Sequence, residues 1–154
     1  SKITVLIVIA FNAYLAVDYL VGFISSNKIV EVYTADEMNE ICNILDENGI
    51  GEDEAITVYG NWDLVYVMST RPHATDYSYQ FPIGEVMPSI MDDYMKQMQE
   101  ELPRVVVVQS GCYDDNIDAF ICDNDYELIW TSHYLRWGED GNLEDPAQLY
   151  LRQN

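Results

Sequence analysis

The chain has 154 residues, a length typical of one domain, and 27 acidic side chains against 7 basic ones give it a net charge of −20 at pH 7. Nucleic-acid binding needs clustered Lys and Arg to neutralise phosphates, and the few bases here are scattered among acids, so the composition argues against nucleic acid as a partner. The paired and tripled acids are typical of a solvated surface, and three cysteines, an odd number, do not suggest a disulfide framework.

The N-terminal part is dominated by an apolar stretch, residues 3–24, whose one charged side chain is Asp18. Its length is close to what a helix needs to cross a bilayer, so we expect residues 1–27 to form a last membrane span. A signal peptide usually has a basic leader and an Ala-x-Ala-like cleavage site, which are not seen here. A buried strand at residues 3–9 followed by a core helix is the other alternative, and it would make the chain a soluble cytosolic α/β protein.

The next segments alternate helix and strand patterns. Thr34 to Glu37 form a Thr-x-x-Glu capping box, which predicts an amphipathic helix that ends at Asn48-Gly49. Residues 56–59 are β-branched and aromatic and predict a short strand, after which Gly60 allows a turn and Asn61 is a candidate N-cap. A short, mostly buried helix is expected from Trp62 to Met68.

An alternating aromatic strip follows the short helix. Tyr77, Tyr79 and Phe81 share one face at period two, so they either cover the sheet or line a groove. Pro88 suits the first turn of a second long helix that Pro103 ends. The next segment after this helix, residues 105–108, is entirely apolar.

Residues 105–108 form an apolar run without alternation, as expected of a central strand that is covered on both faces. A short helix is expected after Asp114 or Asp115, then a strand at residues 126–130 and an antiparallel edge strand at residues 149–152. Strands that alternate with helices predict a small three-layer α/β domain at residues 28–154, with a mostly parallel sheet and helices on both faces.

Few motifs carry recognisable chemistry. The carboxyl ends of the parallel strands should hold residues 60–61, 110–112 and 131–133, as turn and cap residues or as a binding site. Cys112 follows a strand, but residues 113–119 are acidic and contain no arginine, which argues against a cysteine-dependent phosphatase. No cofactor or metal is expected, because the two histidines are 60 residues apart and the calcium-like segment at residues 123–127 lacks the required glycine and glutamate.

The motifs of residues 55–82 carry a family resemblance, together with three later segments. The matching segments are Tyr59-Gly60-Asn61, Val65–Pro72, Tyr77–Pro82, Leu102–Val108, Asp125–Leu128 and Leu149–Arg152. In order and spacing they resemble the outer C-terminal domain of polytopic membrane glycosyltransferases that use a polyprenyl-phosphate sugar, the dolichyl-phosphate-mannose-protein mannosyltransferase-like and aminoarabinose-transferase-like group.

The resemblance implies an accessory role and a location. In that group the catalytic acids and much of the lipid-sugar site lie in the membrane part, so the fragment is expected to be inactive alone, with no catalytic residue. Residues 3–24 would be in the cell membrane, and residues 28–154 would lie on its extracytoplasmic side, joined to the rest of the membrane-embedded protein. A polyprenyl-phosphate sugar or an acceptor glycan is the ligand expected. Its candidate contacts are Asn61, Trp62, Arg71, Tyr77 and Tyr79, although these aromatic side chains can equally pack in the core.

Overall fold

The computed structural model describes residues 14, 16–17, 35–81, 83–134, 136 and 141–153. The chain divides into two units, Ser1–Asp36 and Glu37–Asn154. The apolar stretch at residues 3–24, including the rival strand at residues 3–9, lies outside the described residues except for Tyr14, Ala16 and Val17, which are helical. Within the described ranges, no helix is both long enough and apolar enough to cross a membrane.

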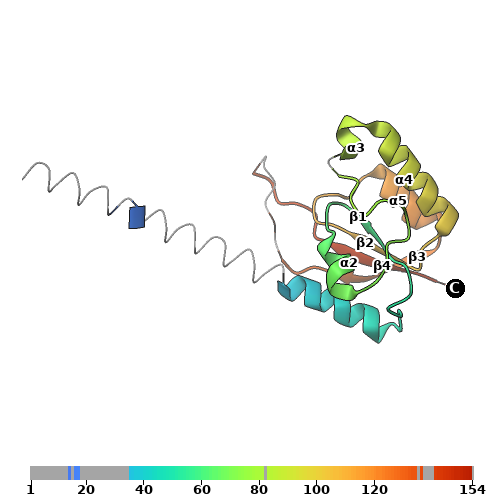
Figure 1. Ribbon diagram of the computed structural model, residues 1–154, viewed down its shortest axis with the longest axis horizontal. Helices are drawn as coiled ribbons and strands as arrows, with labels where there is room; N and C mark the ends of the chain where they lie inside the picture. The colour runs from blue at the N-terminus through green and yellow to red at the C-terminus, as the bar shows by residue number, and fades with distance from the viewer. Residues whose placement is uncertain are drawn as a thin grey trace, which may run out of the picture. The chain divides into compact units, whose positions relative to one another are not determined.

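Four strands form one sheet in the second unit (Figure 1). They are β1 (Thr57–Tyr59), β2 (Val105–Val108), β3 (Tyr126–Thr131) and β4 (Gln148–Arg152), in the spatial order β1-β2-β4-β3. β1 pairs with β2 in parallel, whereas β4 is antiparallel to both of its neighbours. The mixed α/β class is as predicted, but two of the three strand pairings are antiparallel, because β4 lies between β2 and β3.

β4 occupies an interior position, where an edge strand was predicted. Its orientation is antiparallel as expected, with Leu149 opposite Val107 and Tyr150 opposite Val106 of β2. Leu149 and Tyr150 are both buried, and successive residues of a strand face opposite sides of the sheet. β4 therefore needs cover on both faces, which an interior position provides. The prediction that β2 lies inside the sheet is confirmed.

Helices cover the sheet on both faces. Besides the helical residues 35–47, they are α2 (Leu64–Ser69), α3 (Ile83–Val86), α4 (Pro88–Glu101) and α5 (Asp115–Asp123). Figure 1 shows α4 and α5 on one side of the sheet and the helix of residues 35–47 on the other. Two hydrophobic clusters follow from this layering.

The two clusters divide the strand residues between them by alternation. The first joins the helix of residues 35–47 and α2 to alternate strand residues, and includes Met38, Ile41, Leu45, Val58, Val65, Val107 and Leu149. The second joins α4 and α5 to the remaining ones, and includes Tyr59, Tyr94, Met98, Val106, Val108, Ile117, Phe120 and Tyr150. Tyr77 and Phe81 pack against the second cluster, so these two members of the aromatic strip cover the core and do not line a groove.

The turn after β1 differs from the prediction at one position. α2 begins at Leu64, and Asp63 is its N-cap residue without a side-chain capping hydrogen bond. Asn61, the predicted N-cap, lies two residues farther back and is exposed. Asn61 therefore belongs to the turn between β1 and α2 and does not cap the helix.

Side chains satisfy the backbone at the outer edge of β1. The amide N–H of Val58 donates to the hydroxyl of Tyr66 at 2.8 Å. The carbonyl oxygen of Val58 accepts from Gln80 Nε2 at 2.9 Å and from the Tyr94 hydroxyl at 3.1 Å. An unpaired strand edge in the interior would leave these groups without hydrogen bonds, so α2, the aromatic strip and α4 each close part of this edge.

The chain itself also pairs with the start of β1. Ile56 forms a parallel bridge with His73, in which the Ile56 amide donates to the Pro72 carbonyl at 3.0 Å and the Ala74 amide donates to the Ile56 carbonyl at 2.8 Å. The chain from Ile56 to Ala74 thus leaves the sheet, forms α2 and returns to its own starting strand.

β3 forms the opposite edge of the described sheet. Most of its residues are exposed or half-buried, and its pairing with β4 shifts register between Leu128 and Trp130. Ile129 is the extra residue of this bulge. A bulge bends and twists the strand locally, so β3 does not present a flat edge.

Replacement of Tyr66 by Phe tests the closure of the β1 edge. Tyr66→Phe removes the acceptor of the buried Val58 amide, so we expect the free energy of unfolding to fall by about 1 to 2 kcal/mol. Urea denaturation followed by circular dichroism measures this change. Tyr79→Phe is the matched control, since among the described residues the Tyr79 hydroxyl has no hydrogen bond, and equal effects of the two substitutions would contradict the assignment.

Candidate functional site

The carboxyl ends of three strands meet at one edge of the sheet. β1, β2 and β3 run in the same direction, so the segments that follow them come together there, as predicted for residues 60–61, 110–112 and 131–133. In open α/β sheets this edge is the usual place for a ligand. Its side chains are therefore the first candidates for a site.

The loops after β1 and β2 are in close contact. The Asn61 amide donates to Gln109 Oε1 at 2.5 Å, and the Gln109 amide donates to the Tyr59 carbonyl at 3.0 Å. Gly60 has a φ of +147°, and a Cβ atom at this position would lie 2.5 Å from the Gln109 Cβ. The glycine is required here by both conformation and space, because a larger residue would clash with Gln109.

The β2 loop is also fastened to the segment that precedes β4. Ser110 Oγ donates to the Asp145 carbonyl at 2.8 Å, and the Gly111 amide donates to the same oxygen at 3.1 Å. A Cβ at position 111 would approach the Glu144 carboxyl carbon to 2.9 Å. These contacts give the Ser-Gly-Cys turn a structural role.

A buried carboxylate organises the end of β3. Glu37 is fully buried, and its Oε1 accepts from the Ser132 hydroxyl at 2.5 Å. Its Oε2 forms an ion pair with Arg136, whose guanidinium carbon lies 5.3 Å from the ring centroid of Trp62. Charge-assisted hydrogen bonds of Glu37 join the first helix of the unit to the segment after β3, and the cation–π contact joins that segment to Trp62 before α2.

Sequence reasoning gave Glu37 a different partner. It was predicted as the capping-box partner of Thr34, which lies outside the described residues, whereas both of its carboxylate oxygens interact with the segment after β3. Arg136 is 99 residues away in the chain, so no local pattern could have identified this pair.

Two of the predicted contacts, Trp62 and Arg71, belong to the interior. Trp62 is 6% exposed and lies in the first hydrophobic cluster. Arg71 is 4% exposed, forms an ion pair with Asp46 at 2.7 Å and donates to the Ile50 carbonyl at 2.5 Å. The guanidinium of Arg71 thereby ties the segment after α2 to the end of the first helix.

The other three predicted contacts are more accessible. Tyr77 is half-buried, and its hydroxyl donates to Asp93 of α4 at 2.8 Å, on the face of the sheet opposite Trp62. Asn61 is exposed and Tyr79 is half-buried. Trp62 and Tyr77 therefore lie on opposite faces of the sheet, and ligand binding by any of the five predicted residues stays a prediction.

A conservative substitution separates the structural role of Arg71 from ligand contact. Arg71→Lys keeps the charge but loses the forked hydrogen bonding, so we expect the free energy of unfolding to fall by about 2 kcal/mol, measured by chemical denaturation. Lys96→Gln is the control, because Lys96 and its partner Glu100 are both exposed and their ion pair should contribute less than about 1 kcal/mol. Unchanged stability of Arg71→Lys would contradict the structural role.

The tyrosines are the titratable groups most affected by the fold. Burial raises the pKa of Tyr66 and that of Tyr126 each to about 12. Burial also raises the pKa of Tyr94 and of Tyr59, and the carboxylate of Asp114, which accepts from the Tyr59 hydroxyl at 2.8 Å, raises the pKa of Tyr59 further. These hydroxyls act as hydrogen-bond donors or acceptors in their neutral form. Their raised pKa values do not suit proton transfer near neutral pH, because an efficient general acid or base has a pKa close to the working pH.

The raised tyrosine pKa values predict a loss of stability at alkaline pH. An unfolded tyrosine titrates near pH 10, so above that pH the unfolded chain binds fewer protons than the folded one, and stability falls as pH rises from about 10 to about 12. The slope should reach about 1.4 kcal/mol per pH unit for each fully protected tyrosine. Guanidinium denaturation across this range measures it. Tyr66→Phe should have a shallower slope, and a slope equal to that of the unsubstituted chain would contradict the assignment of Tyr66.

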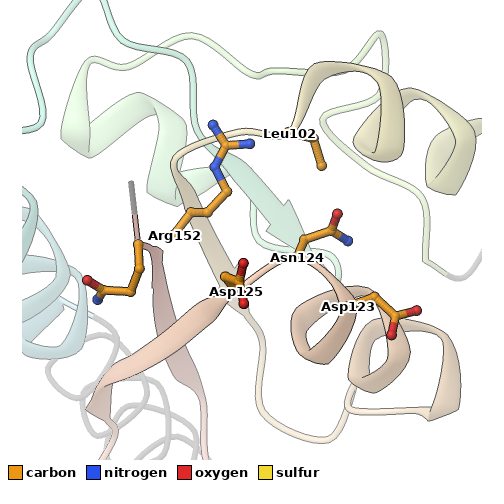
Figure 2. Close-up of a pocket in the computed structure, with 6 residues that line it drawn as sticks. Leu102, Asp123, Asn124, Asp125 and Arg152 are labelled. Carbon is orange, nitrogen blue, oxygen red and sulfur yellow. The ribbon is translucent and has the colours of Figure 1, made fainter.

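An open cavity lies at the opposite edge of the sheet, near the amino ends of β2 and β3 (Figure 2). Its volume is about 380 Å³. It is lined by the residue after α4, by the turn between α5 and β3 and by the end of β4, namely Leu102, Asp123, Asn124, Asp125, Arg152 and Gln153. Sequence analysis treated these segments as a turn and an edge strand, and nothing in their patterns indicates that they meet.

The cysteines and the metal-binding side chain types are the other candidates for a site. None of Cys42, Cys112 and Cys122 forms a disulfide. The part of the chain that the structure describes contains no group of three or more His, Cys, Asp or Glu side chains placed to hold a metal ion. Cys112 lies near Gln109, with Sγ 3.8 Å from its side-chain oxygen.

Comparison of the chain with protein-family models, curated proteins and solved structures gives no match. A functional interpretation therefore rests on the residues themselves, on the resemblance of their motifs and on the geometry described above.

Proposed function

We propose that the chain is the extracytoplasmic C-terminal domain of a membrane glycosyltransferase that uses a polyprenyl-phosphate sugar, with its last membrane span at residues 3–24. In this proposal the domain is accessory and the fragment has no transferase activity of its own. The motif resemblance over residues 55–82 and the later segments supports the family, and the contacts of those motifs support the accessory role.

The observation that carries the accessory role is that polar groups of the resembling motifs are engaged in the fold. The Tyr59 hydroxyl donates to Asp114, and Arg71 is paired with Asp46. Gln80 is fully buried and donates to the backbone of β1. These groups hold segments of the fold together, and their hydrogen bonds within the domain support a structural role for them. The reacting groups are accordingly proposed to lie in the membrane-embedded remainder of the protein.

The net charge supports a role for this domain on the acceptor side and not on the side of the anionic donor. With 27 acidic and 7 basic side chains, the chain repels a polyprenyl-phosphate headgroup and attracts no anionic donor by long-range electrostatics. A neutral acceptor glycan is not repelled. We therefore assign the domain to the acceptor side, with Asn61 and Tyr79 as the most accessible of the predicted contacts and Trp62, Arg71 and Tyr77 mainly as supports.

Removal of residues 1–27 tests the proposal against a soluble cytosolic α/β binding or interaction protein. We expect the 154-residue chain to stay in the membrane fraction after alkaline carbonate extraction and residues 28–154 to be soluble and folded. A folded truncated domain with cooperative thermal unfolding agrees with the membrane span, because the described sheet and both hydrophobic clusters lie beyond residue 27.

Two results would overturn the proposal. Collapse of the fold in residues 28–154 would mean that the apolar segment belongs to the core, as the soluble alternative requires. Transfer of sugar from a polyprenyl-phosphate donor by the isolated 154-residue chain would refute the accessory role. A catalytically inactive, membrane-bound chain is the expected result.

A further inference from the structure

The cavity at the amino ends of the strands contains a guanidinium group without an acidic partner. Among the basic residues that the structure describes, four form ion pairs, which are Arg71 with Asp46, Lys96 with Glu100, Arg104 with Glu54 and Arg136 with Glu37. The fifth, Arg152, has no carboxylate oxygen within 4 Å in the described ranges. In so acidic a chain, an unpaired arginine in a cavity requires an explanation.

The backbone around Arg152 is firmly held. Arg152 is the last residue of the interior strand β4, and its amide donates to the Arg104 carbonyl at 2.9 Å. The next amide, of Gln153, donates to the Asp125 carbonyl at 3.0 Å and so joins the strand end to the turn before β3. The guanidinium therefore projects from a rigid base, close enough to Tyr126 to oppose the rise of that tyrosine's pKa.

Two carboxylates complete the charged lining. Figure 2 shows the guanidinium of Arg152 above the carboxylate of Asp125, whereas the carboxylate of Asp123 points away from both. Asp123 and Asp125 are exposed, and in the described part of the chain neither side chain makes a hydrogen bond. The carboxamide of Asn124, in contrast, donates to the Phe120 carbonyl at 2.7 Å. The charged groups are thus the ones left to meet a ligand.

Backbone geometry fixes two of the lining residues in an uncommon conformation. Leu102 has a φ of 45° and Asp125 a φ of 58°, both in the left-handed region that residues other than glycine seldom adopt. The Leu102 amide donates to the Met98 carbonyl and closes α4, after which Pro103 follows directly. The helix end at Leu102 and the turn at Asp125 account for these conformations, which hold the lining backbone in place.

The arrangement of charge selects the ligand. A simple anion is attracted to Arg152 but repelled by Asp123 and Asp125, and a simple cation meets the opposite balance. A ligand with both signs of charge satisfies both Arg152 and Asp125. We propose that this cavity binds a small zwitterion, with its anionic group on Arg152 and its ammonium group beside Asp125. The volume of about 380 Å³ lies within the range of small-molecule sites.

Two sources can supply this chemistry, a free amino acid and a phosphoethanolamine headgroup. The probes are β-alanine for the first and glycerophosphoethanolamine for the second, with inorganic phosphate and ethanolamine as the separate halves. Each is titrated into the 154-residue chain in non-ionic detergent, and chemical-shift changes of the backbone amides of residues 123–125 and 152–153 are followed by nuclear magnetic resonance. We expect saturable shifts with at least one zwitterion and weaker binding of both halves.

Charge-removing substitutions connect the shifts to the cavity. Arg152→Gln should weaken binding of the zwitterion about tenfold or more, since a charge-assisted hydrogen bond is lost. Asp125→Asn should weaken it as well and should improve the relative binding of phosphate, and asparagine tolerates the left-handed backbone at this position. Lys96→Gln and Asp92→Asn remove the same charges from the exposed surface of α4 and should leave binding unchanged.

Three results would overturn the proposal. They are the absence of saturable shifts with both zwitterions, equal binding of phosphate alone, and unchanged binding by a folded Arg152→Gln variant. Saturation by β-alanine alone identifies a free amino acid as the ligand type, and saturation by glycerophosphoethanolamine alone identifies a headgroup. Neither outcome depends on membrane insertion or on transferase activity, so the zwitterion site and the proposed function can fail independently.

Discussion

The fold of the second unit depends on the burial of β4 between β2 and β3. The strand contributes Leu149 to one hydrophobic cluster and Tyr150 to the other, so one short segment near the C-terminus connects both layers of helices. It also provides the hydrogen bonds that unite the parallel pair β1–β2 with β3. Until this last strand is in place, β3 has no sheet to join, and contacts this distant in sequence make folding depend on long-range pairing.

The second constraint is the outer edge of β1, where the chain uses side chains instead of another strand. Tyr66, Gln80 and Tyr94 reach this edge from three different segments and bond to one residue, Val58. Tyr66 and Gln80 come from the stretch of residues 55–82, and Tyr94 comes from α4, so the closure joins segments on both sides of the aromatic strip.

Local patterns predicted much of the secondary structure. The unbroken valines of β2 indicated an interior strand. Pro88 begins the helix α4, and Pro103 follows its C-cap residue, Leu102. The position of β4 could not be predicted, because a short alternating segment has the same pattern at an edge and in an interior position. The Glu37–Arg136 pair and the lining of the Arg152 cavity also escaped prediction, since both depend on segments that only the folded topology brings together. Arg71 was predicted as a ligand contact, which stays a prediction, and its partners in the fold are Asp46 and the backbone.

The bulged strand β3 has a consequence for the behaviour of the protein at high concentration. An edge strand with regular pairing groups is a template on which another copy of the chain can add a strand. In β3 the extra residue Ile129 interrupts that regularity, and Glu127 is an exposed acid on the same strand. Two such edges would approach each other against the mutual repulsion of two strongly acidic molecules. The edge left open by the fold is thus protected from amyloid-like stacking by its own irregularity and by charge.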